Sequence, residues 1–155
     1  MIQKKDTSKV FIIGTFFLLI SIFLAVAIIY ERNKKVNDRI IKINLNTNVE
    51  ENLNWKFSTK NNIIHAKIGQ VYKIDFNVEN YSSNETSGRA VYEVKPDFIK
   101  KYFVEIDCFC YKKQTLLPSE KSKYSITFYI DPKILSDLKL KDIKDINIYY
   151  TFLNT

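Results

Sequence analysis

The sequence is poor in the residue types that most often carry enzyme chemistry. Its 155 residues include two cysteines, one histidine, one methionine and three glycines. No stretch resembles a Ser/His/Asp triad, a glycine-rich phosphate-binding loop or a pair of catalytic carboxylates. The two cysteines, Cys108 and Cys110, stand in one tripeptide, whereas small secreted disulfide folds spread their cysteines along the chain. The sequence therefore predicts a protein that is not an enzyme, with metal or redox chemistry confined to one short segment.

Positive charge is unevenly distributed along the chain. The formal net charge is +7, and residues 1–42 contain eight Lys or Arg against three Asp or Glu. Residues 43–155 are nearly balanced, with sixteen basic and fourteen acidic residues. A nucleic-acid-binding protein concentrates positive charge on its folded domain. The charge distribution therefore argues against a nucleic-acid partner.

One long apolar run, Val10–Tyr30, contains 21 residues and no charge. As a helix it would be about 30 Å long, the thickness of the hydrocarbon core of a bilayer. The alternative is a cleaved signal peptide, because Ala25-Val26-Ala27 resembles a cleavage site, but the apolar region of such peptides is only about 7–15 residues long. We therefore expect an N-terminal tail at residues 1–9, an uncleaved transmembrane helix at residues 10–30 and a juxtamembrane linker at residues 31–42.

The orientation of this helix is less well specified. Three basic residues precede it and five follow it up to Lys42. The positive-inside rule thus mildly favours a cytoplasmic C-terminal domain, although long domains translocate largely regardless of charge.

Residues 43–155 alternate between apolar and polar side chains, which is typical of half-buried strands. The clearest strands are Val71–Glu79, Tyr124–Ile130 and Asp145–Phe152. Shorter strands are expected at Ile40–Thr47, Asn54–Phe57, Ile63–Ala66, Arg89–Val94, Tyr102–Cys110 and Thr115–Leu117, with a loop at Pro132–Lys144. Many short strands separated by turn residues predict an all-β domain of two packed sheets, with Trp55 and Phe57 in its core.

On a strand, Cys108 and Cys110 would face the same way, about 6.6 Å apart, with Phe109 on the opposite face. This distance is at the upper limit for a disulfide, which would be strained. Two thiolates on one face are a suitable soft-ligand pair for Cu(I). A closed zinc site needs four ligands, and the one histidine, His65, is expected at the surface. Two copies of the chain could instead bring four thiolates together.

Two other interpretations of the cysteine pair remain open at this point. Both residues could simply be buried, since cysteine is among the most buried residue types. A redox role is the second alternative, although redox pairs usually have the spacing Cys-x-x-Cys at the start of a helix. Lysine pairs on either side, Lys100-Lys101 and Lys112-Lys113, are typical of solvated surface and could also lower the pKa of a nearby thiol.

The segment Lys101–Tyr111, KYFVEIDCFCY, resembles the signature of the cytochrome c oxidase copper-assembly protein family of the CtaG type, which has mitochondrial relatives. The resemblance covers residues 43–153 and includes Gln114, Leu116, Asn54–Phe57, Val91–Pro96, Phe128–Pro132 and Ile148–Phe152. Members of that family usually carry a further cysteine just after the membrane helix, which this chain lacks. They often have a basic residue three positions before the first cysteine, where this chain has Glu105.

The resemblance implies an immunoglobulin-like β-sandwich with Cu(I) as cargo on Cys108 and Cys110, in a copper-linked homodimer. It implies delivery of copper to the copper B centre of cytochrome c oxidase subunit I. The chain would be a single-pass protein of the cell inner membrane with its C-terminal domain in the periplasm, or of the mitochondrial inner membrane facing the intermembrane space. The alternatives are a membrane-anchored thiol reductant and a structural assembly factor without stable metal.

Overall fold

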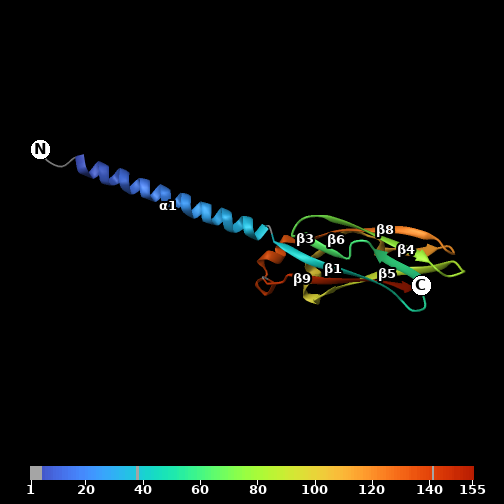
Figure 1. Ribbon diagram of the computed structural model, residues 1–155. Coiled ribbons are helices and arrows are strands. Elements are labelled where there is room, and N and C mark those ends of the chain that lie inside the picture. The colour runs from blue at the N-terminus through green and yellow to red at the C-terminus, as the bar shows by residue number, and fades with distance from the viewer. Residues whose placement is uncertain (1–4, 38, 141) are drawn as a thin grey trace. The chain divides into compact units, whose positions relative to one another are not determined.

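The structure, a computed structural model, describes residues 5–37, 39–140 and 142–155 (Figure 1). The chain divides into an N-terminal unit up to Asp38 and a β-domain, Arg39–Thr155. Part of the expected N-terminal tail, residues 1–4, lies outside the described residues, as does residue 141 of the expected loop.

The N-terminal unit contains one helix, α1 (Lys5–Asn37). Its segment Phe11–Arg32 has a mean hydropathy of 2.9 and is not buried. The hydroxyls of Thr15 and Ser21 donate to the carbonyls three residues earlier in the same helix, so these polar groups do not need water as a partner. An apolar, unburied helix of this length is a candidate membrane span, as the sequence predicts.

The helix is longer than the apolar run that identifies it. It continues through Asn37, and the first strand begins at Ile40. The stretch expected to be a linker, residues 31–42, is therefore largely helix and strand. The residues that follow Tyr30 include Glu31, Arg32 and Lys34, which are good helix formers.

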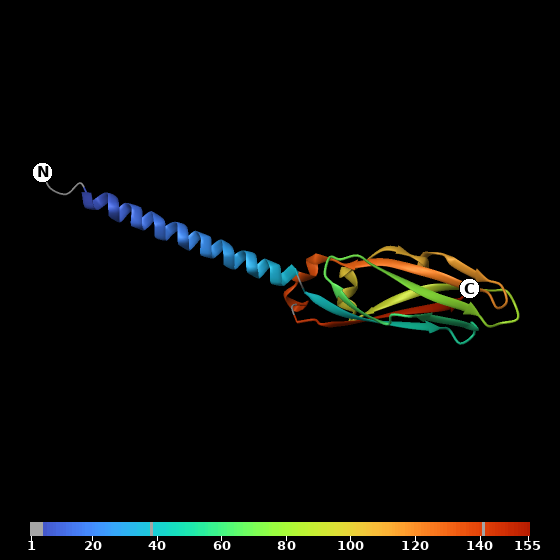
Figure 2. The same cartoon turned by 45° about the horizontal axis from the view of Figure 1, so that its top comes forward.

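The β-domain is built from two sheets. One has the strand order β3-β1-β9-β5-β7 and the other has the order β2-β4-β8-β6. In Figures 1 and 2, β4 and β8 lie in one layer and β1 and β9 in the other. The strands are β1 (Ile40–Val49), β2 (Trp55–Thr59), β3 (Ile63–Lys67), β4 (Tyr72–Asn80), β5 (Thr86–Lys95), β6 (Phe103–Cys108), β7 (Lys113–Leu116), β8 (Lys121–Ile130) and β9 (Asp145–Asn154).

The core lies between the sheets and follows the period-two pattern of the sequence. In β8, Ile126, Phe128 and Ile130 are fully or almost fully buried, while the residues between them are half-exposed. Aromatic rings join the layers, since Phe57 of β2 packs edge-on against Phe152 of β9 with ring centroids 5.0 Å apart. The predicted fold class, an immunoglobulin-like β-sandwich preceded by one apolar helix, is confirmed.

All the predicted strands are present, with ends that differ by a few residues. The expected loop at Pro132–Lys144 contains two short 3-10 turns, η3 (Pro132–Ser136) and η4 (Leu138–Leu140), and another, η1 (Asp97–Tyr102), precedes β6. The difference that matters for the cysteines is in the predicted strand Tyr102–Cys110, which ends at Cys108.

Candidate functional site

Strand β6 is an edge strand, and a β-bulge changes the direction of its side chains. Glu105 lies opposite Phe128 of β8, and Cys108 lies opposite Ile126. Those two positions on β8 are two residues apart, whereas Glu105 and Cys108 are three apart, because Ile106 is an extra residue in β6. Since Phe128 and Ile126 are fully buried, the bulge turns Glu105 and Cys108 to the same inner face.

The chain leaves the strand after Cys108 and forms one 3-10 turn, η2 (Phe109–Tyr111). The backbone N–H of Cys110 donates to the sulfur of Cys108 at 3.1 Å. The side-chain amide of Gln114 donates to the carbonyl oxygen of Phe109 at 3.3 Å. These bonds hold the second cysteine in a tight turn, and β7 starts two residues after that turn.

Cys108 and Cys110 are joined by a disulfide, and their Cα atoms are 5.2 Å apart. The sequence-based expectation of two cysteines on one strand, too far apart for an easy disulfide, is therefore wrong. The reason is the turn: Cys110 is not part of the strand, so the spacing of alternate strand residues does not apply to this pair. Reduction of this bond by two electrons and two protons would give two adjacent thiols.

Phe109 lies in the core instead of on an outer face. It is 8% exposed, and the neighbouring Cys108 and Cys110 are 6% and 7% exposed. Its ring stacks on Tyr124 at 5.3 Å between centroids and on Phe152 at 5.7 Å. Burial raises the pKa of the Tyr124 hydroxyl, which is consistent with the aromatic packing on this side of the turn. The cysteines are thus as buried as the core interpretation predicts.

A carboxylate completes the cluster. One oxygen of Glu105 and the sulfurs of Cys108 and Cys110 all lie within 4.8 Å of one another. The hydroxyl of Tyr150, a fully buried residue of β9, donates to Oε1 of Glu105 at 3.0 Å. From the sequence, Glu105 is a departure from the family pattern and not a site residue. On a regular strand it would face away from Cys108. Only the bulge brings Glu105 and Cys108 together, and no pattern in the sequence predicts the bulge.

The donor atoms of this cluster fit copper in its reduced state. Two thiolates are the soft ligands that Cu(I) prefers, and they become available once the disulfide is reduced. The carboxylate is a harder donor, suited to divalent ions. The cluster can therefore hold a thiophilic metal ion or exchange electrons as a dithiol pair.

The other residues considered from the sequence lie elsewhere. His65 is exposed on β3, at the edge of its sheet, as expected. Lys101 pairs with Asp137 at 3.3 Å instead of facing the cysteines, and Lys100 lies over the ring of Tyr92 at 5.3 Å from its centroid.

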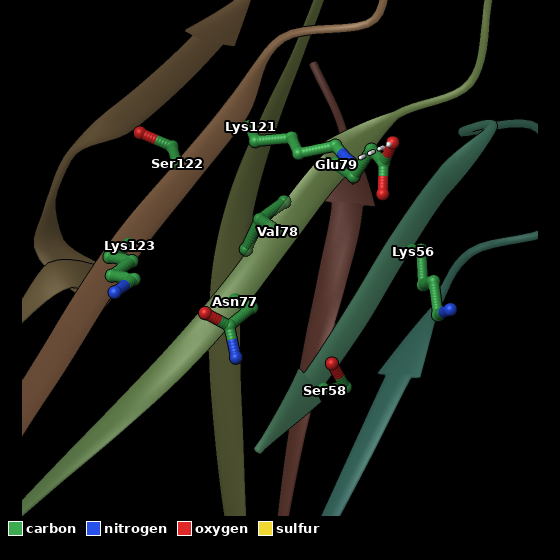
Figure 3. Close-up of a pocket in the computed structure, with 8 residues that line it drawn as sticks. All are labelled: Lys56, Ser58, Asn77, Val78, Glu79, Lys121, Ser122 and Lys123. Carbon is green, nitrogen blue, oxygen red and sulfur yellow. Dashed lines mark ion pairs between the residues drawn. The ribbon is translucent and has the colours of Figure 1, made fainter. Parts of the chain in front are cut away.

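An open hollow of about 350 Å³ is present on the outer face of β2, β4 and β8 (Figure 3). Its lining includes Lys56, Lys123 and the ion pair Lys121–Glu79, whose charged atoms are 3.2 Å apart. The ion pair crosses between neighbouring strands, as its dashed line shows. Long charged side chains on the outer face of a sheet are typical of solvated surface, and this hollow is not part of the cysteine site.

Residues 24–154 match the family model described as cytochrome c oxidase assembly protein CtaG/Cox11. Several similar proteins bear the name cytochrome c oxidase assembly protein CtaG. The one from Ehrlichia ruminantium is 38% identical over 118 residues, which are 76% of this chain and 67% of the relative. Those from Nitrobacter hamburgensis and Bradyrhizobium diazoefficiens are 34% and 37% identical over 114 residues, 74% of this chain and 53% of each relative. This chain thus spans about half the length of these last two relatives.

The family match includes the whole described β-domain up to Asn154, with the bulged strand, the turn and both cysteines. It also reaches into the apolar helix, since it begins at residue 24. The chain belongs to the cytochrome c oxidase assembly protein CtaG/Cox11 family.

Proposed function

We propose that this chain is a membrane-anchored assembly factor that carries Cu(I) on Cys108 and Cys110 and delivers it to the copper B centre of cytochrome c oxidase subunit I. The observation that carries the proposal is the clustering of both sulfurs with a carboxylate at the end of an edge strand and in the turn that follows it. Membership in an oxidase assembly family supports the choice of target.

Copper transfer would proceed by ligand exchange. A dithiol or phosphine reductant first converts the disulfide to two thiols and is itself oxidised. Cu(I) then binds as the thiols release their protons. The ligands of the target replace the sulfurs one at a time, so that the ion is never free in solution. A site with two protein sulfurs permits this exchange, whereas a closed cage of four sulfurs in one chain would retain the metal.

The proposal places residues 43–155 on the non-cytoplasmic side of the membrane. This location is the periplasm of a bacterium or the intermembrane space of a mitochondrion. The candidate membrane span Phe11–Arg32 supports an anchor. A reporter that functions only in the cytoplasm, fused after Thr155, should be inactive; an active reporter would place the site on the wrong side for delivery.

We also propose that copper links two chains, each supplying Cys108 and Cys110 to a shared site. The position of β6 at the edge of its sheet supports such an approach. In the single chain, however, both cysteines are more than nine-tenths buried. Bridging therefore requires the turn η2 to swing outward, and Phe109 must then leave part of its aromatic contacts.

A second candidate function is that of a thiol reductant, and the disulfide between Cys108 and Cys110 favours it. In that role the reduced pair would pass two electrons to a disulfide in another protein and would itself become oxidised. Such a protein has no need to retain metal. The third candidate, a structural assembly factor with core cysteines, is favoured by their burial.

The copper content of oxidase assembled in living cells distinguishes these functions. Cells without their own member of this family would receive the parent chain, the variant Cys108→Ser or the variant Cys110→Ser. The copper-to-haem ratio of the purified oxidase would then be measured. The copper-delivery function predicts that either variant lowers the copper-to-haem ratio, because the copper B ion is missing. An added membrane-permeable thiol should not restore the ratio.

The variant Asp107→Asn is a matched control, because Asp107 is exposed on the same strand. It should support oxidase with normal copper content. Full copper content with either serine variant contradicts the proposal. Restoration of copper by the added thiol would instead support the reductant function.

A further inference from the structure

Glu105 is held at the cysteine pair by the position of its own strand and by a hydrogen bond from the opposite sheet. Strand β6, which carries it, belongs to the four-stranded sheet, and Tyr150 belongs to the five-stranded sheet. The Tyr150 hydroxyl donates to Oε1 of the carboxylate at 3.0 Å, and Tyr150 itself is completely buried. The carboxylate is therefore fixed in direction, and it lies on the same side of the strand as Cys108 because of the bulge.

The spacing of the three donors suits a single ion. In zinc sites the metal lies about 2.3 Å from sulfur and about 2.0–2.2 Å from a carboxylate oxygen. The ligand atoms of Glu105, Cys108 and Cys110 are all within 4.8 Å of one another. Small side-chain movements would therefore allow all three to contact one ion once the disulfide is reduced.

The charges of the three donors also favour a divalent ion. Two thiolates and one carboxylate carry three negative charges, and an ion with two positive charges balances more of them than Cu(I) does. A carboxylate oxygen is a hard donor, which contributes little to the binding of the soft Cu(I) ion but binds Zn²⁺ and Co²⁺ well.

We propose that Glu105 is a third metal ligand, which gives the chain a Cys₂Glu site for a borderline divalent cation of the zinc class. The inference rests on the proposed function in one respect, that the same two cysteines are ligands. Three protein donors leave a fourth position for water, as in open zinc sites. Zn²⁺ then competes with Cu(I) for the reduced cysteines, and Glu105 decides how strongly it competes.

Cobalt provides the test, since Co²⁺ bound by thiolates absorbs in the near ultraviolet and visible range and is displaced by Zn²⁺. The full chain in detergent would be reduced with a phosphine, freed of reductant without oxygen and shown to have two free thiols. The parent, Glu105→Gln and Asp107→Asn would be titrated with Co²⁺ alone. Asp107 makes a good control, because it is an acidic residue of the same strand that lies opposite Thr127, on the outer face of the sheet.

The parent and Asp107→Asn should bind one Co²⁺ per chain with equal affinity, and Glu105→Gln should bind it at least tenfold more weakly. Retention of Cu(I) should be the same in all three. A second variant, Tyr150→Phe, preserves the shape of the core and removes only the hydroxyl. Its Co²⁺ affinity should lie between those of the parent and Glu105→Gln.

Equal Co²⁺ affinity of Glu105→Gln and the parent would overturn the assignment of Glu105. A parent that retains Cu(I) but binds no Co²⁺ would overturn it as well and leave the copper function intact. A parent with two free thiols that retains neither ion would contradict both this inference and the proposed function.

Discussion

The hydroxyl of Tyr150 donates a hydrogen bond of 3.0 Å to the carboxylate of Glu105, a residue 45 positions away in the sequence. The bond joins β9 of one sheet to β6 of the other. It links the interior of the sandwich directly to the cysteine site. Stability of the domain and the geometry of the site are therefore coupled through this hydrogen bond.

The substitution Tyr150→Phe should lower the free energy of unfolding by about 1–3 kcal/mol, because it leaves a partly buried carboxylate without one of its hydrogen-bond donors. Denaturant unfolding of the full chain in detergent measures this value. The neighbouring Tyr149 is half-exposed on the opposite face of β9, so Tyr149→Phe should change the free energy by less than about 0.5 kcal/mol. Equal decreases in the free energy of unfolding of the two variants would show that the hydrogen bond to Glu105 does not stabilise the domain.

The substitution Phe109→Ala should lower the free energy of unfolding by about 3–5 kcal/mol, as is usual when a buried aromatic residue is truncated. Phe109 is 8% exposed and packs on several rings, whereas Phe98 is 57% exposed in η1. The control Phe98→Ala should therefore change stability by less than about 0.5 kcal/mol. If Phe109→Ala were no more destabilising than Phe98→Ala, the turn that carries Cys110 would not be anchored by its aromatic residue.

Asp137 should make the stability of the domain depend on pH. The Tyr102 hydroxyl donates to its carboxylate at 2.8 Å, and the backbone N–H of Lys139 donates at 3.1 Å. These bonds, the first one above all, lower the pKa of Asp137. Because the folded-state pKa is lower than the unfolded value of about 4, this stabilisation is present above pH 4 and is lost as the pH falls through the folded-state pKa.

The variant Tyr102→Phe removes the larger cause of this shift and should raise the pKa of Asp137. It should be less stable than the parent at pH 7, and the difference should shrink as Asp137 becomes protonated in acid. The free energy of unfolding of the parent and of Tyr102→Phe, measured from pH 7 down to pH 3, tests this prediction. A stability difference that stays constant over that range would mean that Tyr102 acts through packing alone.

Most of the fold could be predicted from the sequence, because strands of a sandwich record their buried face in the alternation of side chains. Ile126, Phe128 and Ile130 illustrate this, and their positions in the core follow from that pattern alone. The pairing of strands could not be derived in the same way. The parallel pairing of β1 with β9 joins segments about a hundred residues apart, and no local pattern encodes such a contact.

The two cysteines stand out as a pair in the sequence, but the geometry around them does not. The segment from Phe103 to Cys110 contains four residues that favour strands and no glycine or proline, so nothing in it indicates a bulge at Ile106 or a turn at Phe109. Both features arise from tertiary packing, since the turn places Phe109 among the rings of the core. This is why the disulfide was not expected and why Glu105 was not identified as a neighbour of the cysteines.

The copper content of the reduced full chain tests the central claim most directly. The parent, Cys108→Ser, Cys110→Ser and Asp107→Asn would be loaded with Cu(I) and passed through gel filtration in a buffer that contains a competing thiol, with circular dichroism to verify folding. Each serine hydroxyl lies in a buried position and could cost about 1–3 kcal/mol, so this verification is needed. The account predicts that the parent and Asp107→Asn retain copper and that both serine variants, although folded, lose it. A parent that elutes without copper while its two thiols are free, or folded serine variants that retain as much copper as the parent, would contradict it.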